Sequence, residues 1–495
     1  MSVSFSQIPA NLRLPLFHAE VDASQASYFV QDQRALLIGQ RLSTGTAVAD
    51  VPVLVSSTDQ AVTLFGAGSV LARMVAAYRR NDDFGGIWCL PLADAVAAVA
   101  ATGTVTLTGT TTAAGALSLY IAGQRVQVAV ASGAAATVAT ALAAAITAAS
   151  DLPVTAAAST GTVTLTAKNK GPLGNDIDVR LNFLGALGGE ATPAGLTAAI
   201  VAMANGATAP SLAAGLAALG DEPFDFIASP YTDTTSLDAI KTLMDDQTGR
   251  WAWSRQLYGH VFAARRGTVS DLSTFGNARN DPHVTVLGYA ASPTPPWEWA
   301  AALTGQAAKS LRIDPARPLQ TLPLVGVLAP AVSARFTMSE RQILLFDGVA
   351  TFTTGTDGTV RIERAITTYQ VNAYGQPDPS YLDVETLFTL TTVLRRLRSV
   401  ITTKYARHKL ANDGTTFGAG QAIVTPKIIK AELIAQYSEM ETLGLVENMA
   451  AFKANLIVER DPTDPNRLNV LYPPDLVNQL RVFAVLAQFR LQYAA

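Results

Sequence analysis

The chain has 495 residues, of which 49% are hydrophobic and 15% charged, and its formal net charge is −3. This composition is typical of a globular protein with two or more domains, and it excludes a disordered chain. No Lys/Arg run is present, so we expect no nucleic-acid partner, and the single cysteine, Cys89, excludes internal disulfides and cysteine-rich metal sites.

The N-terminal stretch "MSVSFSQIPANLRLPLFHAEVD" lacks a charged segment followed by an apolar one, so it predicts no secretory signal. Two pieces of it, "SVSFSQI" and "LRLPL", instead alternate between apolar and other residues as a β-strand does, and Pro15 suits an edge strand because proline cannot donate to a ladder. The apolar positions of these two pieces are Val3, Phe5, Leu12, Leu14 and Leu16.

Strand and helix patterns alternate on both sides of the middle of the chain. Buried strands are predicted at "RALLIG" (34–39) and "GIWCLPL" (86–92), with the helix "GSVLARMVAAYRR" between them. After residue 206 the strands "FDFIASP", "HVFAAR" and "HVTVLGY" follow, with the helix "TTSLDAIKTLMDD" after the first of them. This alternation predicts a doubly wound, mostly parallel α/β sheet.

Residues 93–206 differ sharply, because they are rich in Ala, Gly and Thr and almost devoid of aromatic residues. The heptad "TGTVTLT" occurs twice, at 102–108 and 160–166, and "GALSLYIAGQRVQVAV" predicts a hairpin turning at Ala122-Gly123. The segment "AAATVATALAAAITAA" predicts a soluble helix rather than a membrane span, which would be richer in Leu, Ile and Phe. We interpret 93–206 as a small α+β domain inserted into the α/β domain.

A second α+β region follows the Pro-rich "SPTPPWEW" and a loop-rich crossing, "RIDPARPLQTLPLVGVLAP". A hairpin is predicted to turn at Asp357-Gly358, and Ser380 with Asp383 to form a capping box for a helix over 381–404. Thr425-Pro426 begins a further helix that ends at Gly444. The strand "NLIVER" (455–460) and the strand at the C-terminus are expected to complete this unit.

The chain ends on "RVFAVLAQFRLQYAA", in which every second residue is apolar. This pattern is typical of a half-buried strand, and an unpaired apolar strand is prone to aggregation. Two partners remain open: the hairpin at 350–370 of the same chain, or β-structure of another molecule. The positions concerned are Phe483, Val485, Phe489, Leu491 and Tyr493.

Motifs for catalysis or for cofactor binding are missing from the sequence. The histidines are scattered without a second metal ligand at the required spacing, and the adjacent pairs Asp82–Asp83 and Asp245–Asp246 are interpreted as solvated charge. Gly66-Ala-Gly68 imitates a dinucleotide-binding turn, but Leu71 stands where a third small residue is needed. We therefore predict no enzyme and no cofactor. An NAD(P)-binding oxidoreductase of the Rossmann type remains an alternative function, and the Gly66-Ala-Gly68 turn is the feature that supports it.

Two residue groups allow a binding role beside a structural one. Trp251 with Trp253, and Trp297 with Trp299, are W-x-W pairs that could form a ligand platform, although core or interface anchors are the simpler interpretation. Four arginines lie partly on the polar side of the 381–404 helix, where they are either a solvated face or an electrostatic contact with an acidic partner. These arginines are Arg395, Arg396, Arg398 and Arg407.

Several long ordered strings stand out in the chain, among them "IPANLRLPLFHAEVDAS", "SPTPPWEWAAALTGQ", "TVRIERAITTYQVNAYGQPDPSYLDVETL", "KLANDGTTFGAGQAIVTP" and "LVNQLRVFAVLAQFRL". These strings resemble the tail sheath proteins of Mu-like contractile-tailed phages. The likeness spans the chain and is weakest in 93–206. A sheath of a defective prophage or of a tailocin would read the same, and a surface adhesin built on the 93–206 region is a further alternative.

The resemblance implies a structural subunit of the phage tail, assembled in the host bacterial cytoplasm. Such subunits have a core sometimes described as subtilisin-like, stack as six-subunit rings around a tail tube, and contract to drive the tube through the host envelope. Their terminal arms join a strand-containing domain of a neighbour. The implied partners are other copies of the chain, the tube protein, and baseplate and tail terminator proteins, without nucleic acid or membrane insertion.

These expectations divide the chain into five parts. The predicted parts are an N-terminal arm (1–21), an α/β sheath core (22–92 plus 207–345), an inserted domain (93–206), a C-terminal α+β assembly domain (346–480) and a C-terminal strand arm (481–495).

Overall fold

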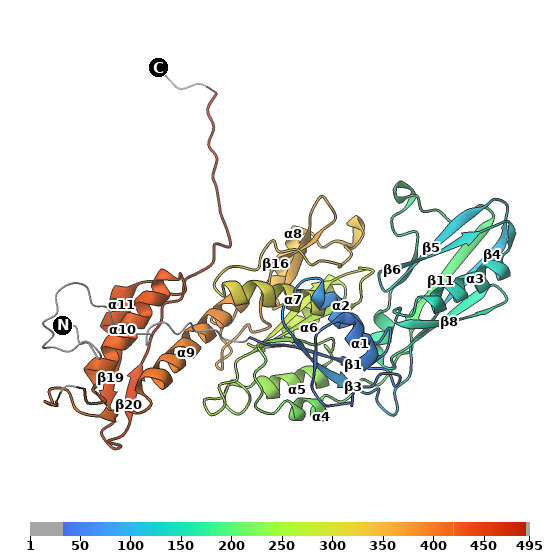
Figure 1. The fold of residues 1–495 in the computed structure, drawn as a ribbon. Coiled ribbons are helices and arrows are strands. Elements are labelled where there is room, and N and C mark those ends of the chain that lie inside the picture. Colours follow the sequence, from blue (N-terminus) through green and yellow to red (C-terminus); the bar gives the residue numbers. More distant parts are fainter. Residues whose placement is uncertain (1–32, 419, 492–495) are drawn as a thin grey trace, which may run out of the picture.

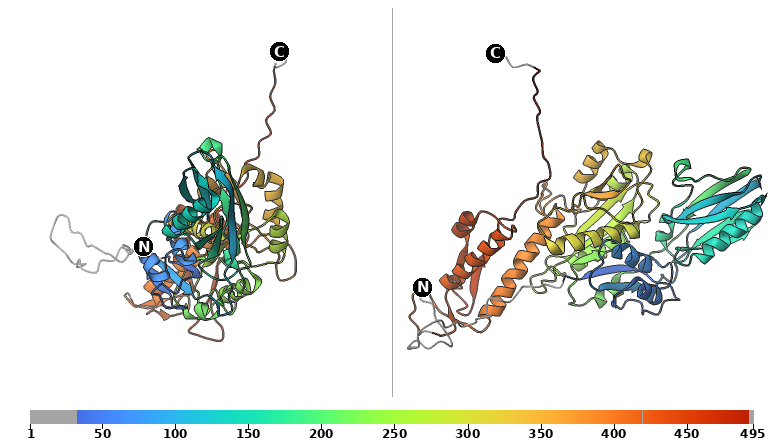
Figure 2. Two further views of the ribbon diagram at one scale, coloured as in Figure 1. Left: turned by 90° about the vertical axis from the view of Figure 1, so that its right-hand side faces the viewer. Right: turned by 45° about the horizontal axis from the view of Figure 1, so that its top comes forward.

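A computed structural model describes residues 33–418 and 420–491. The molecule is elongated, and three regions follow one another along its length (Figure 1). The insert (93–206) forms one end, an α/β core lies in the middle, and a C-terminal unit (393–477) forms the other end. Residues 482–491, called the arm below, run away from the body (Figure 2).

A six-stranded sheet organises the core, in the order β14-β13-β12-β1-β3-β2. All neighbours in this sheet run parallel except β2, which pairs antiparallel with β3 at one edge. The predicted strands and the doubly wound, mostly parallel arrangement are confirmed. The strands are β1 (Ala35–Gln40), β2 (Val53–Val55), β3 (Ile87–Leu92), β12 (Phe226–Ala228), β13 (His260–Arg266) and β14 (Val284–Tyr289).

Helices cover both faces of this sheet. On one face α2 packs against α7, and the two lie over β1, β12 and β13, while α4 and α5 lie on the other side (Figure 1). The predicted helices at 68–80 and 234–246 are confirmed as α2 and α5. The helices of the core are α1 (Thr58–Phe65), α2 (Val70–Arg79), α4 (Ala213–Ala218), α5 (Thr234–Met244), α6 (Val269–Asn277), α7 (Pro296–Ile313) and α8 (Met338–Phe346).

Helix α7 is the largest element that the sequence pattern did not predict. It begins inside the Pro-rich segment, with Pro296 at its first position, where the missing N–H costs nothing and the fixed φ suits a helix. Trp297 and Trp299 are both buried, so this pair anchors the core and forms no exposed platform. A helix that is buried nearly all round shows no amphipathic period, which explains why the pattern was missed.

The other tryptophan pair separates in the structure. Trp251 is half-buried and its ring stacks on the ring of His283, with 4.1 Å between the centroids, whereas Trp253 is exposed. The two residues follow α5 in a turn-rich segment outside any strand, so their alternate spacing does not place them on one face.

The insert contains two antiparallel sheets, one α-helix, α3 (Ala135–Ala148), and two short 3-10 helices. The two "TGTVTLT" copies pair with each other, so that Val105 lies opposite Val163 and Thr106 opposite Thr162. The hairpin that turns at Ala122-Gly123 is confirmed. The strands are β4 (Thr102–Thr111), β5 (Gly115–Ile121), β6 (Gln124–Val130), β7 (Gly133–Ala134), β8 (Val154–Ser159), β9 (Thr162–Ala167), β10 (Val179–Leu181) and β11 (Leu196–Ala204).

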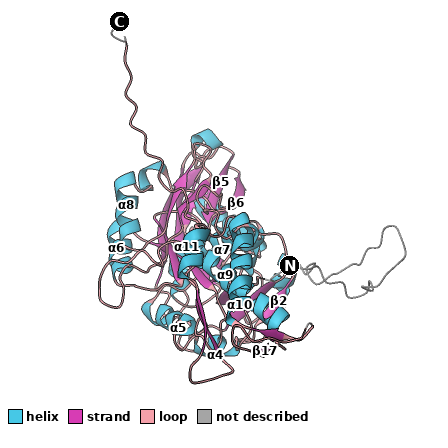
Figure 3. Cartoon of the chain, turned by 90° about the vertical axis from the view of Figure 1, so that its left-hand side faces the viewer, coloured by secondary structure: helices cyan, strands magenta, loops and turns pink. Residues whose placement is uncertain are grey.

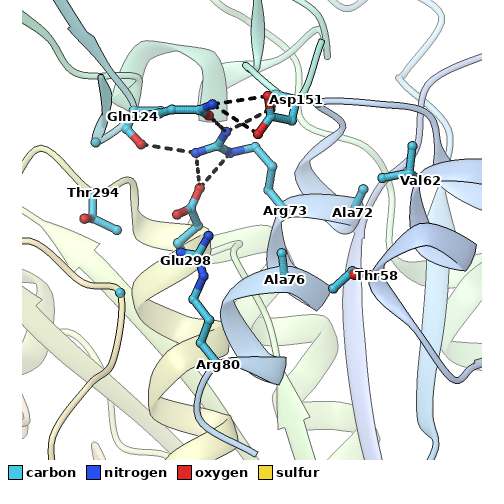
Figure 4. A pocket seen from close by; sticks show the side chains of 14 residues that line it. Thr58, Val62, Ala72, Arg73, Ala76, Arg80, Gln124, Asp151, Thr294 and Glu298 are labelled. Carbon is cyan, nitrogen blue, oxygen red and sulfur yellow. Dashed lines mark hydrogen bonds and ion pairs between the residues drawn. The ribbon is translucent and has the colours of Figure 1, made fainter. Parts of the chain in front are cut away.

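Polar side chains join the insert to the core. Arg73 of α2 points into the junction, where its Nε lies 2.7 Å from Oε1 of Glu298 on α7 (Figure 4). The same guanidinium donates to the carbonyl oxygens of Ala122 (3.1 Å) and Asp151 (2.8 Å) in the insert. Asn169 of the insert donates to the carbonyl of Arg41 and accepts from the amide of Val70. Arg73 thus joins a side chain of the core to the backbone of the insert, and Asn169 joins a side chain of the insert to the backbone of the core.

The C-terminal part begins with the predicted hairpin of β15 (Thr351–Thr354) and β16 (Val360–Arg364). Thr425 accepts from the amide of Ile428 and begins α10, which ends before Gly444, as predicted. The remaining elements are α9 (Val384–Tyr405), β17 (Lys409–Leu410), β18 (Ile423–Val424), α10 (Pro426–Thr442), α11 (Met449–Asn455), β19 (Ile457–Arg460) and β20 (Leu468–Leu471).

The predicted capping box of α9 is wrong. Asp383 occupies the N-cap position, but its side chain caps no amide of the helix. Its carboxylate instead receives two hydrogen bonds from Arg364, at 3.0 and 2.9 Å, and an ion pair from Arg481. The hydroxyl of Ser380 donates to Asp378. Two arginines distant in the sequence thus bind the carboxylate of Asp383, which the local spacing predicted to cap the first amides of α9.

Packing does not change at the predicted boundary at residue 346. Phe352, Ile362 and Phe388 belong to the main hydrophobic cluster, together with the core and the insert. A second cluster begins at Val393 and extends into α10, α11 and the residues after β20. The change therefore falls inside α9, which begins on the core and ends in the C-terminal unit. A pattern of strands and helices does not reveal on which body a hairpin packs.

The structure also corrects the interpretation of Asp82 as a solvated charge. This carboxylate is buried, lies 2.5 Å from Nη1 of Arg312 and accepts from the hydroxyl of Tyr78. Burial raises the pKa of the Tyr78 hydroxyl, so the hydroxyl stays protonated and donates. Asp83 beside it is exposed, as predicted.

The Gly66–Gly68 turn does not have the geometry of a dinucleotide site. It joins α1 to α2, so a helix precedes it where a dinucleotide-binding turn requires a strand. Across residues 33–418 and 420–491 no cluster of three His, Cys, Asp or Glu side chains is suited to hold a metal ion. In the same ranges no helix has both the length and the apolar character that crossing a membrane requires.

Candidate assembly interface

Part of the predicted arm set lies outside the described residues. This applies to the N-terminal positions and to the last C-terminal one, and the structure says nothing of them. They are Val3, Phe5, Leu12, Leu14, Leu16 and Tyr493.

The arm is an extended segment without helix or strand (Figure 3). Its large apolar side chains are exposed. Phe483 and Phe489 are each 83% exposed and Leu491 is 96% exposed. Val482 and Leu486, on the opposite face of an extended chain, are exposed as well. The arm is therefore apolar on both faces up to Ala487, and not on one face alone as the alternation predicted.

The hairpin at 350–370 does not pair with the arm. The outer edge of β16 is bonded to the loop before α8: the amide of Ile362 donates to the carbonyl of Leu322 (2.9 Å), and the amide of Leu324 to the carbonyl of Val360 (2.9 Å). Ala350, directly before β15, bridges to β14. Within the described part of the chain, no strand pairing includes residues 482–491.

A short sheet in the C-terminal unit has the properties of an acceptor. Strands β19 and β20 pair only with each other among the described residues, so each leaves its outer edge without a ladder. Ile457, Val470 and Leu471 on them are exposed. An isolated two-stranded sheet is marginally stable, and unpaired edges accept further strands.

Sequence reasoning located β19 but did not predict the strand that pairs with it. Its partner in the structure is β20, which follows a turn over 461–467. The carboxylate of Asp461 accepts from the amides of Thr463 and Asp464 in that turn, and hydrogen bonding holds the pKa of Asp461 below its ordinary range. The turn residues "DPTDPN" were the available signal for this hairpin.

The four predicted arginines do not form one surface group. Arg395 is buried, lies 2.5 Å from Oδ1 of Asp225 and donates to the carbonyl of Tyr258, so it holds α9 on the core. Burial raises the pKa of Asp225, and the guanidinium opposes that shift. Arg396 pairs with Glu439 of α10. Arg398 and Arg407 are exposed and remain candidates for a contact with an acidic surface.

Comparison with known proteins connects this architecture to one family. The family model of the phage tail sheath protein central domain matches residues 205–368, and that of the phage tail sheath C-terminal domain matches 376–490. The Mu-like prophage FluMu tail sheath protein of Haemophilus influenzae is 44% identical over 492 residues, which cover 99% of this chain and 100% of that one.

Solved structures of low identity were also found. The sheath tail protein of Listeria innocua is 12% identical, with 92% of this chain and 94% of that chain covered and a TM-score of 0.49. The sheath of an extracellular contractile injection system in its contracted state is 10% identical, with 98% and 99% covered and a TM-score of 0.49. At these scores the likeness of shape carries no weight, and the assignment depends on sequence. The chain belongs to the phage tail sheath family, a family of structural proteins and not of enzymes.

Proposed function

We propose that this chain is the repeating subunit of a contractile tail sheath, which polymerises as stacked hexameric rings around a tail tube and contracts to drive the tube through the host envelope. The observation that carries the proposal is the arm, because a segment with this many exposed apolar side chains and no partner strand in the described chain requires one elsewhere. The full-length relationship to a tail sheath protein supports the same function.

The arm of one copy adds as a strand to the β19–β20 sheet of another copy. Strand addition satisfies main-chain groups of both partners, and pockets for alternate side chains set the register. Five or six hydrogen bonds contribute roughly 0.5–1.5 kcal/mol each. Two buried phenylalanines contribute about 1.5–3 kcal/mol each. The sum is on the order of 5–15 kcal/mol before the entropy cost of ordering the arm is subtracted. A link that persists while subunits rotate requires an interaction of this strength.

The N-terminal arm supplies a further strand to the same kind of sheet. Its alternating positions, Val3 with Phe5 and Leu12 to Leu16, suit an edge strand. Donor and acceptor surfaces differ in both exchanges, so the contact is heterologous and propagates as rings and helices. Contacts between core regions then exchange during contraction while the arms remain inserted.

Further partners follow from this function. They are the tail tube protein and the baseplate and terminator proteins, and the protein is part of the virion after assembly in the bacterial cytoplasm. Arg398 and Arg407 are the exposed cations that would contact an acidic tube or subunit surface. We propose the predicted roles for the five parts, except that the β15–β16 hairpin and the start of α9 belong with the core. The subtilisin-like description of the core is part of the same proposal.

Removing the arm tests strand exchange. Deletion of residues 482–495 removes the arm and keeps all residues up to Arg481. We therefore expect a soluble subunit with unchanged circular dichroism that forms no striated tubes in negative-stain microscopy. A matched pair refines the result: Phe489→Asp should prevent tubes, whereas Gln488→Asp, on the opposite face, should not. Tubes formed by the deletion variant would refute strand donation, and an unfolded variant would favour intramolecular pairing.

Contraction is proposed to release energy stored in a metastable extended lattice, without nucleotide. Calorimetry of assembled sheaths should record a single irreversible exothermic event on contraction. A reversible or endothermic event would contradict stored energy in the lattice.

A further inference from the structure

The chain crosses from the C-terminal unit to the core immediately before the arm begins. Leu476 bridges to Val446, and the amide of Val477 donates to the carbonyl of Leu445, so these residues still belong to the C-terminal unit. Gln320 of the core then donates to the carbonyl of Leu480 at 3.2 Å. The arm therefore leaves the body beside the end of α9 that lies on the core, as both Figure 1 and Figure 2 show.

The side chain of Arg481, directly before the arm, is held by the body. Its side chain is 12% exposed, whereas Val482 directly after it is 79% exposed. Nη2 of Arg481 lies 2.8 Å from Oε2 of Glu385 and 3.1 Å from Oδ1 of Asp383. Asp383 is the N-cap residue of α9 and Glu385 lies in its first turn, where the helix dipole also favours negative charge.

Glu385 makes this contact hard to break. Its side chain is fully buried, and Oε1 accepts from the amide of Leu319 at 2.7 Å. Burial raises the pKa of Glu385, and the positive charge of Arg481 opposes that shift. Asp383 is shared with Arg364, but Arg481 is the cation that contacts Glu385. Withdrawal of Arg481 would leave a buried carboxylate without its counter-ion, a state that proteins avoid.

We propose that Arg481 anchors the root of the arm to the core of its own chain, so that a pull on the donated arm acts on the start of α9 and not on the C-terminal unit. The inference depends on the strand exchange proposed above. Without the anchor, only two single hydrogen bonds among the described residues join this crossing to the core, from Gln320 to the carbonyl of Leu480 (3.2 Å) and from Gln479 to the carbonyl of Ala316 (3.4 Å). The nearest backbone–backbone hydrogen bond is at Val477. A pull that breaks the two single bonds would then add four residues to the tether and lengthen it by about 13–14 Å when extended. Such slack would weaken the transmission of movement between neighbouring cores.

Trypsin digestion of the unassembled full-length subunit tests the anchor without reference to assembly. Trypsin must draw the side chain of Arg481 out of the body to cut the bond to Val482. We expect slow cutting in the native protein and about tenfold faster cutting in Glu385→Gln, because cleavage follows the population of the opened form. The matched control is Asp221→Asn, which removes the carboxylate partner of the more exposed Arg255 and should leave cutting at 481 unchanged.

Two results would overturn the anchor. One is native cutting at Arg481 as fast as at the exposed Arg407, and the other is no difference between Glu385→Gln and the native protein. Both readouts keep Arg481 in place, so they apply even where a variant at 481 itself does not fold.

Assembly of variants at residue 481 tests the mechanical role. Arg481→Met keeps the length of the side chain and removes its charge, so we expect tubes that form but contract incompletely in electron micrographs, with recovery in Arg481→Lys. If Arg481→Met tubes contract as the wild type does, the anchor is refuted. Strand exchange is still supported in that case if the 482–495 deletion variant forms no tubes. Tubes formed by that deletion variant would refute strand exchange instead, and the trypsin result would still decide whether Arg481 holds the root.

Discussion

The insert and the C-terminal unit are both attached to the α/β core, but in different ways. The insert shares the main hydrophobic cluster, and hydrogen bonds of Arg73 and Asn169 link it to α2 and to Arg41 directly after β1. The C-terminal unit has a cluster of its own and is joined mainly through α9, where Arg395 pairs with Asp225 and the ring of Phe388 stacks on Phe226 at 4.8 Å.

This difference separates two mechanical roles. A region that shares its hydrophobic cluster with the core moves with the core as one body, because interiors are close-packed and transmit displacement. A region with its own cluster can keep its internal packing while its orientation to the core changes. The proposed acceptor sheet lies in the second kind of region, which suits a link that has to persist while subunits rotate.

The largest expected effect comes from a charge on the acceptor sheet. Val470→Asp should give a folded subunit that forms no tubes, because an incoming apolar strand would have to bury an unpaired carboxylate. The matched control, Val201→Asp, places the same charge on the exposed strand β11 of the insert and should leave assembly intact. Negative-stain microscopy gives the readout. If the two variants assembled equally well, the β19–β20 sheet would not be the acceptor, and the two regions would not differ in this role.

A second prediction concerns the joint at α9. Arg395→Met should reduce the free energy of unfolding by about 3–5 kcal/mol, because it leaves the buried Asp225 without its ion-pair partner. Urea denaturation followed by tryptophan fluorescence measures this change. Arg396→Met is the control, since its pair with Glu439 is more exposed and should contribute only about 0–1 kcal/mol. A loss of the same size in both variants would show that Asp225 does not form the joint.

The smallest of the three effects is expected at the insert. Arg73→Met should cost about 1.5–3 kcal/mol, since charge-assisted hydrogen bonds to Glu298 and to two carbonyls are lost. Hydrogen exchange at the 121–124 turn should rise, while exchange in α10 should not. Lys309→Met removes an exposed pair with Asp83 and serves as the control. Unchanged exchange at the turn would mean that the shared hydrophobic cluster alone holds the insert.

Periodicity and turn chemistry determined much of the fold from the sequence alone. The parallel strands, α2, α3, α5, the start of α10 and the hairpins at Ala122-Gly123 and Asp357-Gly358 all follow from local patterns. The strand-like alternation of the arm was also visible in the sequence, and long ordered strings carried the resemblance to the family that full-length comparison confirms. Each of these signals is local, because a helix face or a turn depends on residues a few positions apart.

Only the tertiary structure decided which charges are buried and which strands pair. Asp225 and Arg395 are 170 positions apart, and Glu385 and Arg481 are 96 positions apart, so no spacing rule relates them. The same holds for β20 as the partner of β19 and for α7, whose burial on nearly all sides removes the amphipathic pattern. Burial is a property of the whole packed chain, and it makes Arg395, which the sequence placed on a polar face, the contact that joins α9 to the core.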